Sequence, residues 1–263
     1  MIMILCLLIT FIACLAGTIC GMGGGIIIKP VLDAFGVMPV ATITFLSGCT
    51  VVAMTCWNVS KSVWKKETAI DLKHTTFLAI GAAVGGLLGK RLFNLVAAQF
   101  EDQNMAGGVQ ACLLLAATFL TLLYTLRKDR IRSRKVDNLA ACVVIGLALG
   151  LLGSFLGIGG GPFNVAILSY FFSMGTKQAA QNSLYIILFS QAASTLRTIL
   201  TTGIPDLNVW ILVGMVAMGI VGSEVGRRLN KKLNERTATI CLILAMLLIM
   251  AINIFNIYKY LLA

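Results

Sequence analysis

Two glycine clusters are the residues of this sequence whose spacing most clearly indicates chemistry. Segment 17–25 reads GTICGMGGG and segment 153–161 reads GSFLGIGGG, so five glycines in one match five in the other. Glycine turns leave backbone N–H groups uncovered, and a helix that follows presents the positive end of its dipole. Two such helix starts, near Ile26 and at Pro162, predict an anion site built from backbone groups. The candidate glycines are Gly23, Gly24, Gly25, Gly159, Gly160 and Gly161.

Neutral polar side chains close to the clusters could complete this site. When Ala41 is aligned with Ala179, Thr44 falls opposite Asn182, a symmetric pair of hydrogen-bonding groups suited to the oxygens of an oxyanion. An amide in hydrocarbon is costly unless it has a partner, which favours Asn and Gln as ligands. Ser and Thr in membrane helices often bond their own backbone instead. The candidate substrate-binding side chains are Thr44, Asn164, Gln181, Asn182 and Ser183.

Glycine also serves close helix packing, and its spacing separates the two roles. Gly85 and Gly89, like Gly222 and Gly226, have the four-residue spacing of a packing surface between helices. Three consecutive glycines make a poor helix and therefore a poor packing ridge. We predict packing for the spaced pairs and anion binding for the clusters.

Few charged residues fall inside the apolar runs. Glu224 stands three residues before Arg227, a spacing that predicts an ion pair on one helix face. Lys29 and Arg197 are predicted to lie toward the outer side of the membrane, where long side chains snorkel to the interface. Attraction of anions to a vestibule is their alternative role. We therefore expect recognition by neutral donors, with no Lys or Arg indispensable for binding.

The sequence offers little support for soluble enzyme chemistry. It has no HExxH motif, no DDxxD-like acidic cluster and no Ser/His pair within one helix, so no catalytic residue is expected. The eight cysteines lie in apolar runs without CxxC spacing, and neither a metal nor a cofactor is predicted. The net charge of +11 could suggest nucleic acid, but the basic residues stand in short loops, where they set membrane topology. No nucleic-acid partner is expected.

The elements that would position the candidate residues are membrane helices. Of the 263 residues 59% are hydrophobic and 12% charged, whereas a soluble domain is roughly a quarter charged. Most of the uncharged runs are near the ~17–25 residues that a spanning helix needs. The runs are 1–28, 34–60, 75–89, 103–126, 138–176, 178–196, 207–223 and 237–258. We predict an all-α, multi-pass integral protein of the inner membrane, with the lipid bilayer as its surroundings.

The chain divides into two related halves. Besides the glycine clusters, residues 85–92 match residues 222–229. The predicted units are a first transmembrane repeat at 1–126, a basic cytoplasmic linker at 127–137 and a second transmembrane repeat at 138–263. Internal repeats of this kind are typical of secondary transporters.

Run 138–176 is too long for one crossing, which predicts that each repeat is a Gly-broken, re-entrant helical hairpin plus three transmembrane helices. This arrangement places 16 of the 21 Lys and Arg residues on one side, against 12 if each hairpin segment crosses once. The positive-inside rule then puts both termini outside, and the odd number of crossings makes the halves inverted repeats. A glycine turn at the far surface gives the same parity and is left open.

At these residues the sequence resembles the TauE/SafE family of sulfite and organosulfonate exporters, and the resemblance covers nearly the whole chain. It rests on GMGGG and GIGGG, on Pro30, on segment 176–183 (TKQAAQNS) and on the closing motif at 222–229. The resemblance implies transport of small sulfur oxyanions or organic anions across the cytoplasmic membrane. Phe45 stands where the family pattern has Ser, a departure in the first half of the symmetric site.

The first hypothesis is a secondary transporter, an exporter of small sulfur-containing anions such as sulfite or organosulfonates, bound between the two glycine breaks near the membrane midplane. The alternatives are an uptake permease for another small organic anion, and a structural or partner-binding membrane subunit. The sequence leaves open the substrate, the direction of transport, the coupling ion and whether the protein forms a homodimer.

Overall fold

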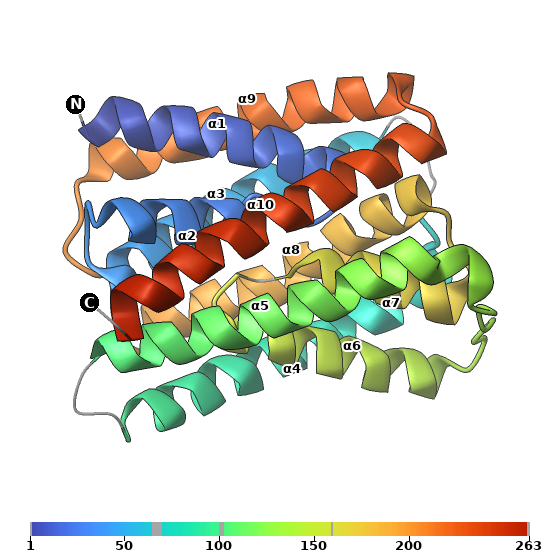
Figure 1. Ribbon diagram of the computed structural model, residues 1–263, viewed down its shortest axis with the longest axis horizontal. Coiled ribbons are helices and arrows are strands. Elements are labelled where there is room, and N and C mark those ends of the chain that lie inside the picture. The colour runs from blue at the N-terminus through green and yellow to red at the C-terminus, as the bar shows by residue number, and fades with distance from the viewer. Residues whose placement is uncertain (1, 65–69, 100–102, 159, 262–263) are drawn as a thin grey trace.

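The computed structural model describes residues 2–64, 70–99, 103–158 and 160–261, whose regular structure is entirely helical. The helices are α1 (Ile2–Cys20), α2 (Gly25–Phe35), α3 (Val40–Trp64), α4 (Leu72–Ala97), α5 (Gln103–Arg127), α6 (Leu139–Phe155), α7 (Pro162–Phe172), α8 (Thr176–Thr201), α9 (Val209–Lys232) and α10 (Glu235–Leu261). One turn of 3-10 helix, Lys128–Arg130, follows α5. Figure 1 shows a bundle whose long helices run side by side from one end to the other.

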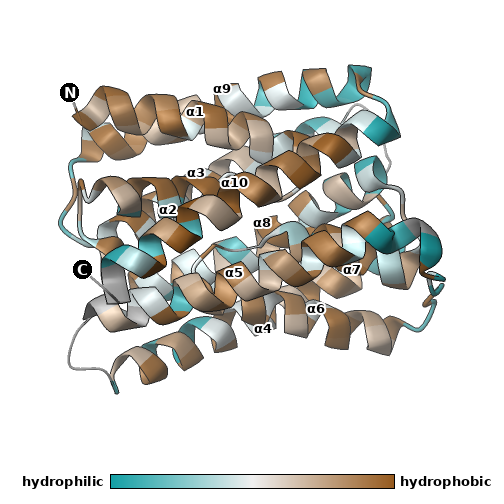
Figure 2. Ribbon diagram, in the orientation of Figure 1, coloured by the Kyte–Doolittle hydropathy of each residue, from teal (hydrophilic) through white to brown (hydrophobic). Residues whose placement is uncertain are grey.

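Seven helices within the described ranges are long and apolar enough to cross a membrane, namely α1, α3, α4, α5, α8, α9 and α10. Helices α2 and α7 have only 11 residues each. At ~1.5 Å per residue they reach about 16 Å, roughly half of a ~30 Å hydrocarbon core. Figure 2 shows hydrophobic residues along the helices and hydrophilic residues gathered at the right-hand end. The fold is that of a multi-pass membrane protein.

The glycine clusters end helices α1 and α6 with the same backbone bond. In the first cluster the amide of Met22 donates to the carbonyl of Gly17 at 3.0 Å. In the second cluster the amide of Ile158 donates to the carbonyl of Gly153, also at 3.0 Å. Two segments that match in sequence therefore fold alike, and the long run at 138–176 is divided at its cluster.

Both turns use a glycine in the left-handed region of backbone conformation. Gly21 and Gly157 occupy equivalent places, and each has a φ of 70°. A residue with a side chain would bring its Cβ against the following carbonyl there, at a cost of roughly 1–2 kcal/mol. Helices α2 and α7 begin after these turns. Pro162 takes the first position of α7, where its missing N–H forfeits no helical hydrogen bond.

The two helical hairpins open at opposite ends of the bundle. In Figure 1, α1 begins at the left-hand end and α2 returns toward that end, whereas α6 begins at the right-hand end and α7 returns there. In the linker before α6, the amides of Arg134 and Val136 donate to carbonyls near the end of α7. Their acceptors are Tyr170 at 2.7 Å and Phe171 at 3.0 Å. The start of α6 and the end of α7 therefore lie together.

Spaced glycines bring α9 directly against α1. A Cβ atom placed on Gly222 would lie 2.5 Å from the carbonyl oxygen of Phe11. One placed on Gly226 would lie 2.5 Å from the carbonyl oxygen of Leu15. No larger residue fits between backbones that approach so closely. The packing role predicted for these two glycines is confirmed.

Helices α4 and α6, which correspond in the repeat to α9 and α1, meet in the same way. Cβ atoms placed on Gly85 and Gly89 would collide with the carbonyl oxygens of Leu147 and Leu151. The packing role predicted for this pair is also confirmed. Helix α6 adds a glycine that the matched motif does not contain, because a Cβ atom on Gly150 would meet the backbone of α4. The interface is therefore formed by small residues from both helices.

One end of the bundle gathers the loops predicted to be cytoplasmic. Lys128 donates to Thr176 at 2.9 Å and to Thr239 at 3.3 Å, which joins the basic linker to the starts of α8 and α10. His74, in the first turn of α4, lies 3.6 Å from Asp137 in the same linker. Residues 65–69 of the loop before α4 lie outside the described part of the chain. The side of the membrane that this end faces remains a prediction.

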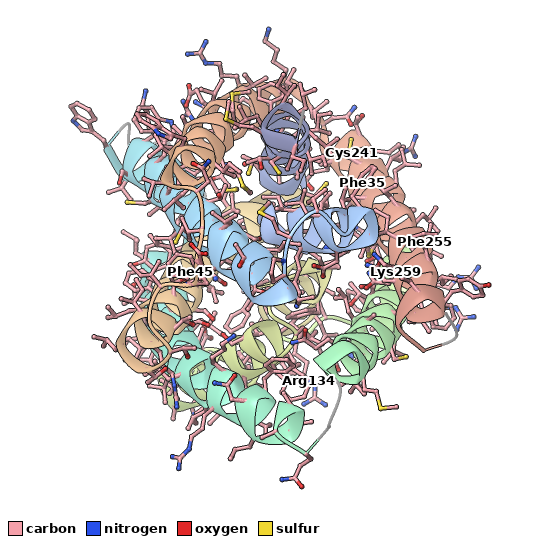
Figure 3. All side chains as sticks on the ribbon, turned by 90° about the vertical axis from the view of Figure 1, so that its left-hand side faces the viewer. Phe35, Phe45, Arg134, Cys241, Phe255 and Lys259 are labelled. Carbon is pink, nitrogen blue, oxygen red and sulfur yellow. The ribbon has the colours of Figure 1, made fainter. Side chains whose placement is uncertain are left out.

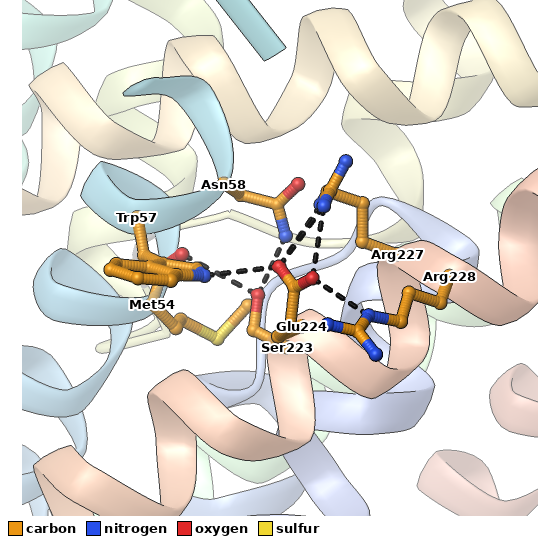
Figure 4. A network of polar contacts seen from close by, with 7 residues as sticks. All are labelled: Met54, Trp57, Asn58, Ser223, Glu224, Arg227 and Arg228. Atoms are coloured by element: carbon orange, nitrogen blue, oxygen red, sulfur yellow. Dashed lines mark hydrogen bonds and ion pairs between the residues drawn. The ribbon is translucent and has the colours of Figure 1, made fainter. Parts of the chain in front are cut away.

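The predicted ion pair between Glu224 and Arg227 is confirmed. A guanidinium nitrogen of Arg227 lies 3.0 Å from Glu224 Oε1, and Arg228 Nε lies 2.9 Å from the same oxygen. Trp57 of α3 donates its indole N–H to the other carboxylate oxygen at 3.1 Å. Figure 4 shows the carboxylate held by these three residues, so its role is to tie α9 to α3.

Candidate functional site

The two glycine breaks meet inside the bundle. A Cβ atom placed on Gly25 would lie 3.2 Å from the carbonyl oxygen of Ile158 in the other break. A Cβ atom placed on Gly161 would lie 3.2 Å from the side chain of Ile26. The starts of α2 and α7 are thus brought together, although 136 residues separate the matched clusters in sequence. The first amides of a helix have no carbonyl partner one turn back. The amides of Ile27 and Asn164 already donate to the carbonyls of Gly24 and Gly161, at 3.1 Å and 3.0 Å, so the amides that precede them are the candidate donors.

Helices α3 and α8 cover the meeting point with apolar side chains. A Cβ atom on Gly23 would contact Ile187 of α8 at 3.6 Å and Val51 of α3 at 3.7 Å. Ile187 also touches Gly160 of the second break. Ile187 is fully buried. The breaks are therefore enclosed by protein, as non-helical backbone at membrane depth must be.

Among the predicted side chains, Asn164 and Ser183 reach the breaks. Asn164 belongs to α7 itself. It is 1% exposed, and its amide nitrogen lies 2.9 Å from where a Cβ on Gly160 would stand. The carbonyl oxygen of this side chain is buried and accepts no hydrogen bond. Ser183 of α8 also reaches the breaks, because its hydroxyl donates to the carbonyl of Gly21 at 2.6 Å.

The other predicted side chains lie on the flanking helices. Thr44 donates to the carbonyl of Val40 at 2.7 Å, the local bond that membrane threonines often make. Gln181 is half-buried, and its side-chain oxygen has no hydrogen-bond partner. Gly159 lies outside the described residues. The assignment of these residues to a substrate site remains a prediction.

Asn182 is fully buried, and its described bonds hold α8 against the start of α4. Its side-chain oxygen accepts from the amide of Asp71 at 3.0 Å and from the hydroxyl of Thr75. Its amide donates to the carbonyl of Gln178 at 2.8 Å. The bonds to Asp71 and Thr75 connect α8 to the start of α4, whereas the bond to Gln178 lies within α8. Asn182 therefore has a structural role, whatever further part it takes in binding.

A lysine that was predicted to snorkel outward is instead buried at the second break. Lys29 is only 6% exposed, so the snorkelling interpretation is wrong. Its ammonium donates to the side-chain oxygen of Gln110 on α5 at 2.6 Å. The same nitrogen lies 2.8 Å from where a Cβ on Gly157 would stand. A positive charge therefore adjoins the glycine turn.

Beside Lys29 is a small cavity between α2, α5 and α10, into whose largely apolar lining several polar residues enter. Its volume is about 20 Å³, enough for one water molecule. Asp33 and Asn256, two of its lining residues, each have a buried side-chain oxygen that accepts no hydrogen bond. Gln110 is held in place because its amide donates to the carbonyl of Phe155 at 2.6 Å.

Comparison with known proteins agrees with this architecture. The model of the family named Sulfite exporter TauE/SafE matches residues 6–254. The chain belongs to this family. It is also similar to "Probable membrane transporter protein YunE" of Bacillus subtilis (strain 168), with 23% identity in an alignment 263 positions long that covers 90% of this chain and 92% of that protein. No solved structure matches the chain.

In this TauE/SafE protein the placement of Lys29 could have been inferred from one sequence signal. Helix α2 begins at Gly25, so Lys29 lies only about one turn from the break. Side chains on a helix lean toward its N-terminus, which aims a long lysine back at the glycines. Asp33 follows four residues later on the same face. A lysine and an aspartate on one face of a short buried helix indicate a polar site.

Proposed function

We propose that this TauE/SafE protein is a secondary transporter that exports small sulfur-containing anions such as sulfite or organosulfonates. The anion binds where the starts of α2 and α7 meet, near the membrane midplane. Free backbone amides of the two breaks supply neutral donors, and Asn164 and Ser183 are the nearest predicted side chains. The site acts by binding and release, with no catalytic residue and no cofactor.

One observation carries this proposal, the contact between the two glycine breaks. Each break ends in the N-terminus of a short helix, and Gly25 lies against Ile158 across the interface. The positive ends of two helix dipoles therefore point toward one place, each worth up to roughly 2 kcal/mol to a partly buried anion. A structural subunit would have no use for two such buried turns, and this favours transport.

The proposed membrane arrangement is two inverted repeats, each with a re-entrant hairpin and three crossings. It is supported by the opposite directions in which α1 and α6 enter the bundle (Figure 1). The equal hydrogen bonds at Met22 and Ile158 also support it. Both termini then lie outside the cell membrane, and the basic linker at 127–137 lies in the cytoplasm.

The proposal is tested by a ligand screen on purified protein. Sulfite, thiosulfate, sulfoacetate, sulfate and short carboxylates are added separately, and the melting temperature is measured for each. We expect sulfur-containing anions to raise the melting temperature progressively, with the logarithm of their concentration once it exceeds the dissociation constant, because a ligand that binds only the folded state stabilises it. Proteoliposomes loaded with the best ligand should then release it faster than protein-free liposomes loaded with the same ligand.

The alternatives give different results in the same screen. Stabilisation by carboxylates alone would indicate a permease for other organic anions. If no anion changes the melting temperature and none crosses the proteoliposome membrane, the transporter proposal fails and a structural subunit is favoured.

A further inference from the structure

Lys29 adjoins two features of the protein. Its ammonium lies against Gly157 in the second glycine break, where the anion is proposed to bind. It also lines the cavity of about 20 Å³ between α2, α5 and α10, together with Leu156 and Ile158 of the same break. The cavity has room for a water molecule. Lys29 therefore connects the proposed anion site to the cavity that Asp33 lines.

Asp33 faces the same cavity from the next turn of α2. It is 7% exposed, and its Oδ1 atom has no hydrogen-bond donor. The ammonium of Lys29 donates to Gln110 and leaves this oxygen unsatisfied. A buried carboxylate oxygen without a donor is costly, and a bound proton or a hydrogen-bonded water removes that cost.

The charges of Lys29 and Asp33 decide when an anion can bind. With both residues ionised, the carboxylate of Asp33 opposes the charge of Lys29 and weakens its attraction for an anion. When Asp33 carries a proton, the positive charge of Lys29 is unopposed and attracts the anion. Binding of the anion and binding of the proton therefore strengthen each other, because such linkage is reciprocal.

We propose that Asp33 is a proton-binding residue whose protonation enables Lys29 to bind the anion, so that one proton travels with each anion. The inference rests on the proposed function and names its coupling ion. The proton comes from water and converts the carboxylate of Asp33 to a carboxylic acid. It returns to water when the anion leaves, and no other bond changes.

The other charged groups around the pair are lysines. Lys259 of α10 donates to the backbone carbonyls of Asp33 at 3.0 Å and Ala34 at 3.3 Å, and so caps the end of α2. Figure 3 shows Lys259 among α2, α5 and α10 at the end of the bundle where α1 begins. Lys90 of α4 carries a like charge that repels the charge of Lys29. Asparagines from α10 and Gln110 from α5 are neutral, so among the described residues facing the cavity Asp33 is the acid.

The test uses purified full-length protein and the panel anion that stabilises the wild type most. Its dissociation constant is measured at several pH values for wild type, Lys29→Gln, Lys29→Arg and Asp33→Asn. Arg197→Gln and Asp206→Asn are the matched controls, because Arg197 donates to the carbonyl of Leu87 on α4 and Asp206 is exposed in the loop before α9. The ligand's own ionisation is the same for every variant, so differences from wild type report the protein.

We expect Lys29→Gln to weaken binding roughly 10- to 150-fold, the range for loss of a charge-assisted hydrogen bond, and Lys29→Arg to restore part of it. Wild-type affinity should fall as the pH rises. Asp33→Asn should bind at high pH at least as tightly as wild type does at low pH, with a flatter pH profile. In proteoliposomes, wild-type anion flux should carry protons, and flux through Asp33→Asn should not.

Three results separate the possibilities. If the wild type binds an anion and both Lys29→Gln and Asp33→Asn match its affinity and pH profile, this inference is overturned while the transport proposal stands. If Asp33→Asn abolishes a dependence on Na⁺ instead of on pH, the cavity binds a metal cation and the proton assignment is wrong. If no panel anion binds the wild type, the proposed function itself fails.

Discussion

At the scale of single residues, the position of Lys29 changes how the site is understood. A lysine at the centre of a membrane costs about 2.5–3.5 kcal/mol on insertion scales, so a protein keeps one there only where it has partners. Lys29 has Gln110 as hydrogen-bond acceptor and Asp33 as countercharge on the same helix. The neutral-donor mechanism expected from the sequence stays a prediction, and Lys29, whose ammonium adjoins Gly157 of the second break, is the residue that tests it.

Gly157 offers a direct test of that contact. Gly157→Ala would place a methyl group 2.8 Å from the Lys29 ammonium in a residue whose φ is 70°. We expect a loss of roughly 1–2 kcal/mol of stability from backbone strain, and weaker anion binding because the ammonium must move. The measurements are the melting temperature and the dissociation constant of the best panel anion.

Gly203→Ala is the matched control for this substitution. Gly203 has a φ of 79°, and a Cβ atom there would meet nothing within 4 Å. It should lose stability through strain alone and keep its affinity. Equal affinity losses in both variants would show that the contact with Lys29 has no part in binding.

At the scale of helices, the repeated motifs predicted more of the structure than the isolated residues did. The breaks at both clusters and the packing of Gly85, Gly89, Gly222 and Gly226 followed from the sequence, because glycine spacing expresses a local backbone requirement. The helices that pack against these glycines could not be predicted, since nothing in the sequence of α9 indicates that it contacts α1. Long-range pairing depends on the three-dimensional arrangement of all the helices.

The glycine interface between α4 and α6 should be intolerant of one methyl group. Gly85→Ala would force its Cβ into the carbonyl of Leu147, so the helices must separate. We expect destabilisation of roughly 1–3 kcal/mol, the usual range for overpacking. Gly214→Ala is the control, because the atoms nearest to its Cβ belong to the side chain of Leu7, which can move. Melting temperatures in one detergent compare the two, and equal values would contradict the rigid interface.

Asn182 connects α8 to the start of α4, so replacing it should lower the stability of the fold. Asn182→Ala removes the acceptor for the amide of Asp71 and the hydroxyl of Thr75. Leaving buried donors without partners costs roughly 1–3 kcal/mol, so the melting temperature should fall clearly. A measured affinity that drops while the melting temperature stays at the wild-type value would instead place Asn182 among the ligand donors.

At the scale of the whole molecule, the two halves pack alike where they share glycines and differ elsewhere. Helix α1 lies on α9 through Gly222, just as α6 lies on α4 through Gly85. Beside α6 there is an apolar groove of about 450 Å³, lined by residues of α5, α6 and α7. We expect any movement during transport to leave the glycine interfaces intact, because backbones already in contact cannot approach further.

The distribution of charge over the whole molecule predicts its orientation. Loops that carry most of the Lys and Arg residues share one end, where Lys128 joins the linker to α8 and α10. The positive-inside rule places that end in the cytoplasm.

Single cysteines at Lys135 and at Asp206, on a background with exposed native cysteines such as Cys56 and Cys112 replaced, would be treated in intact cells with a membrane-impermeant thiol reagent. We expect labelling at position 206 and none at 135 until the cells are permeabilised. Because all crossings are linked by parity, labelling at 135 alone would reverse the orientation of the entire protein, and labelling at both would refute the re-entrant hairpins.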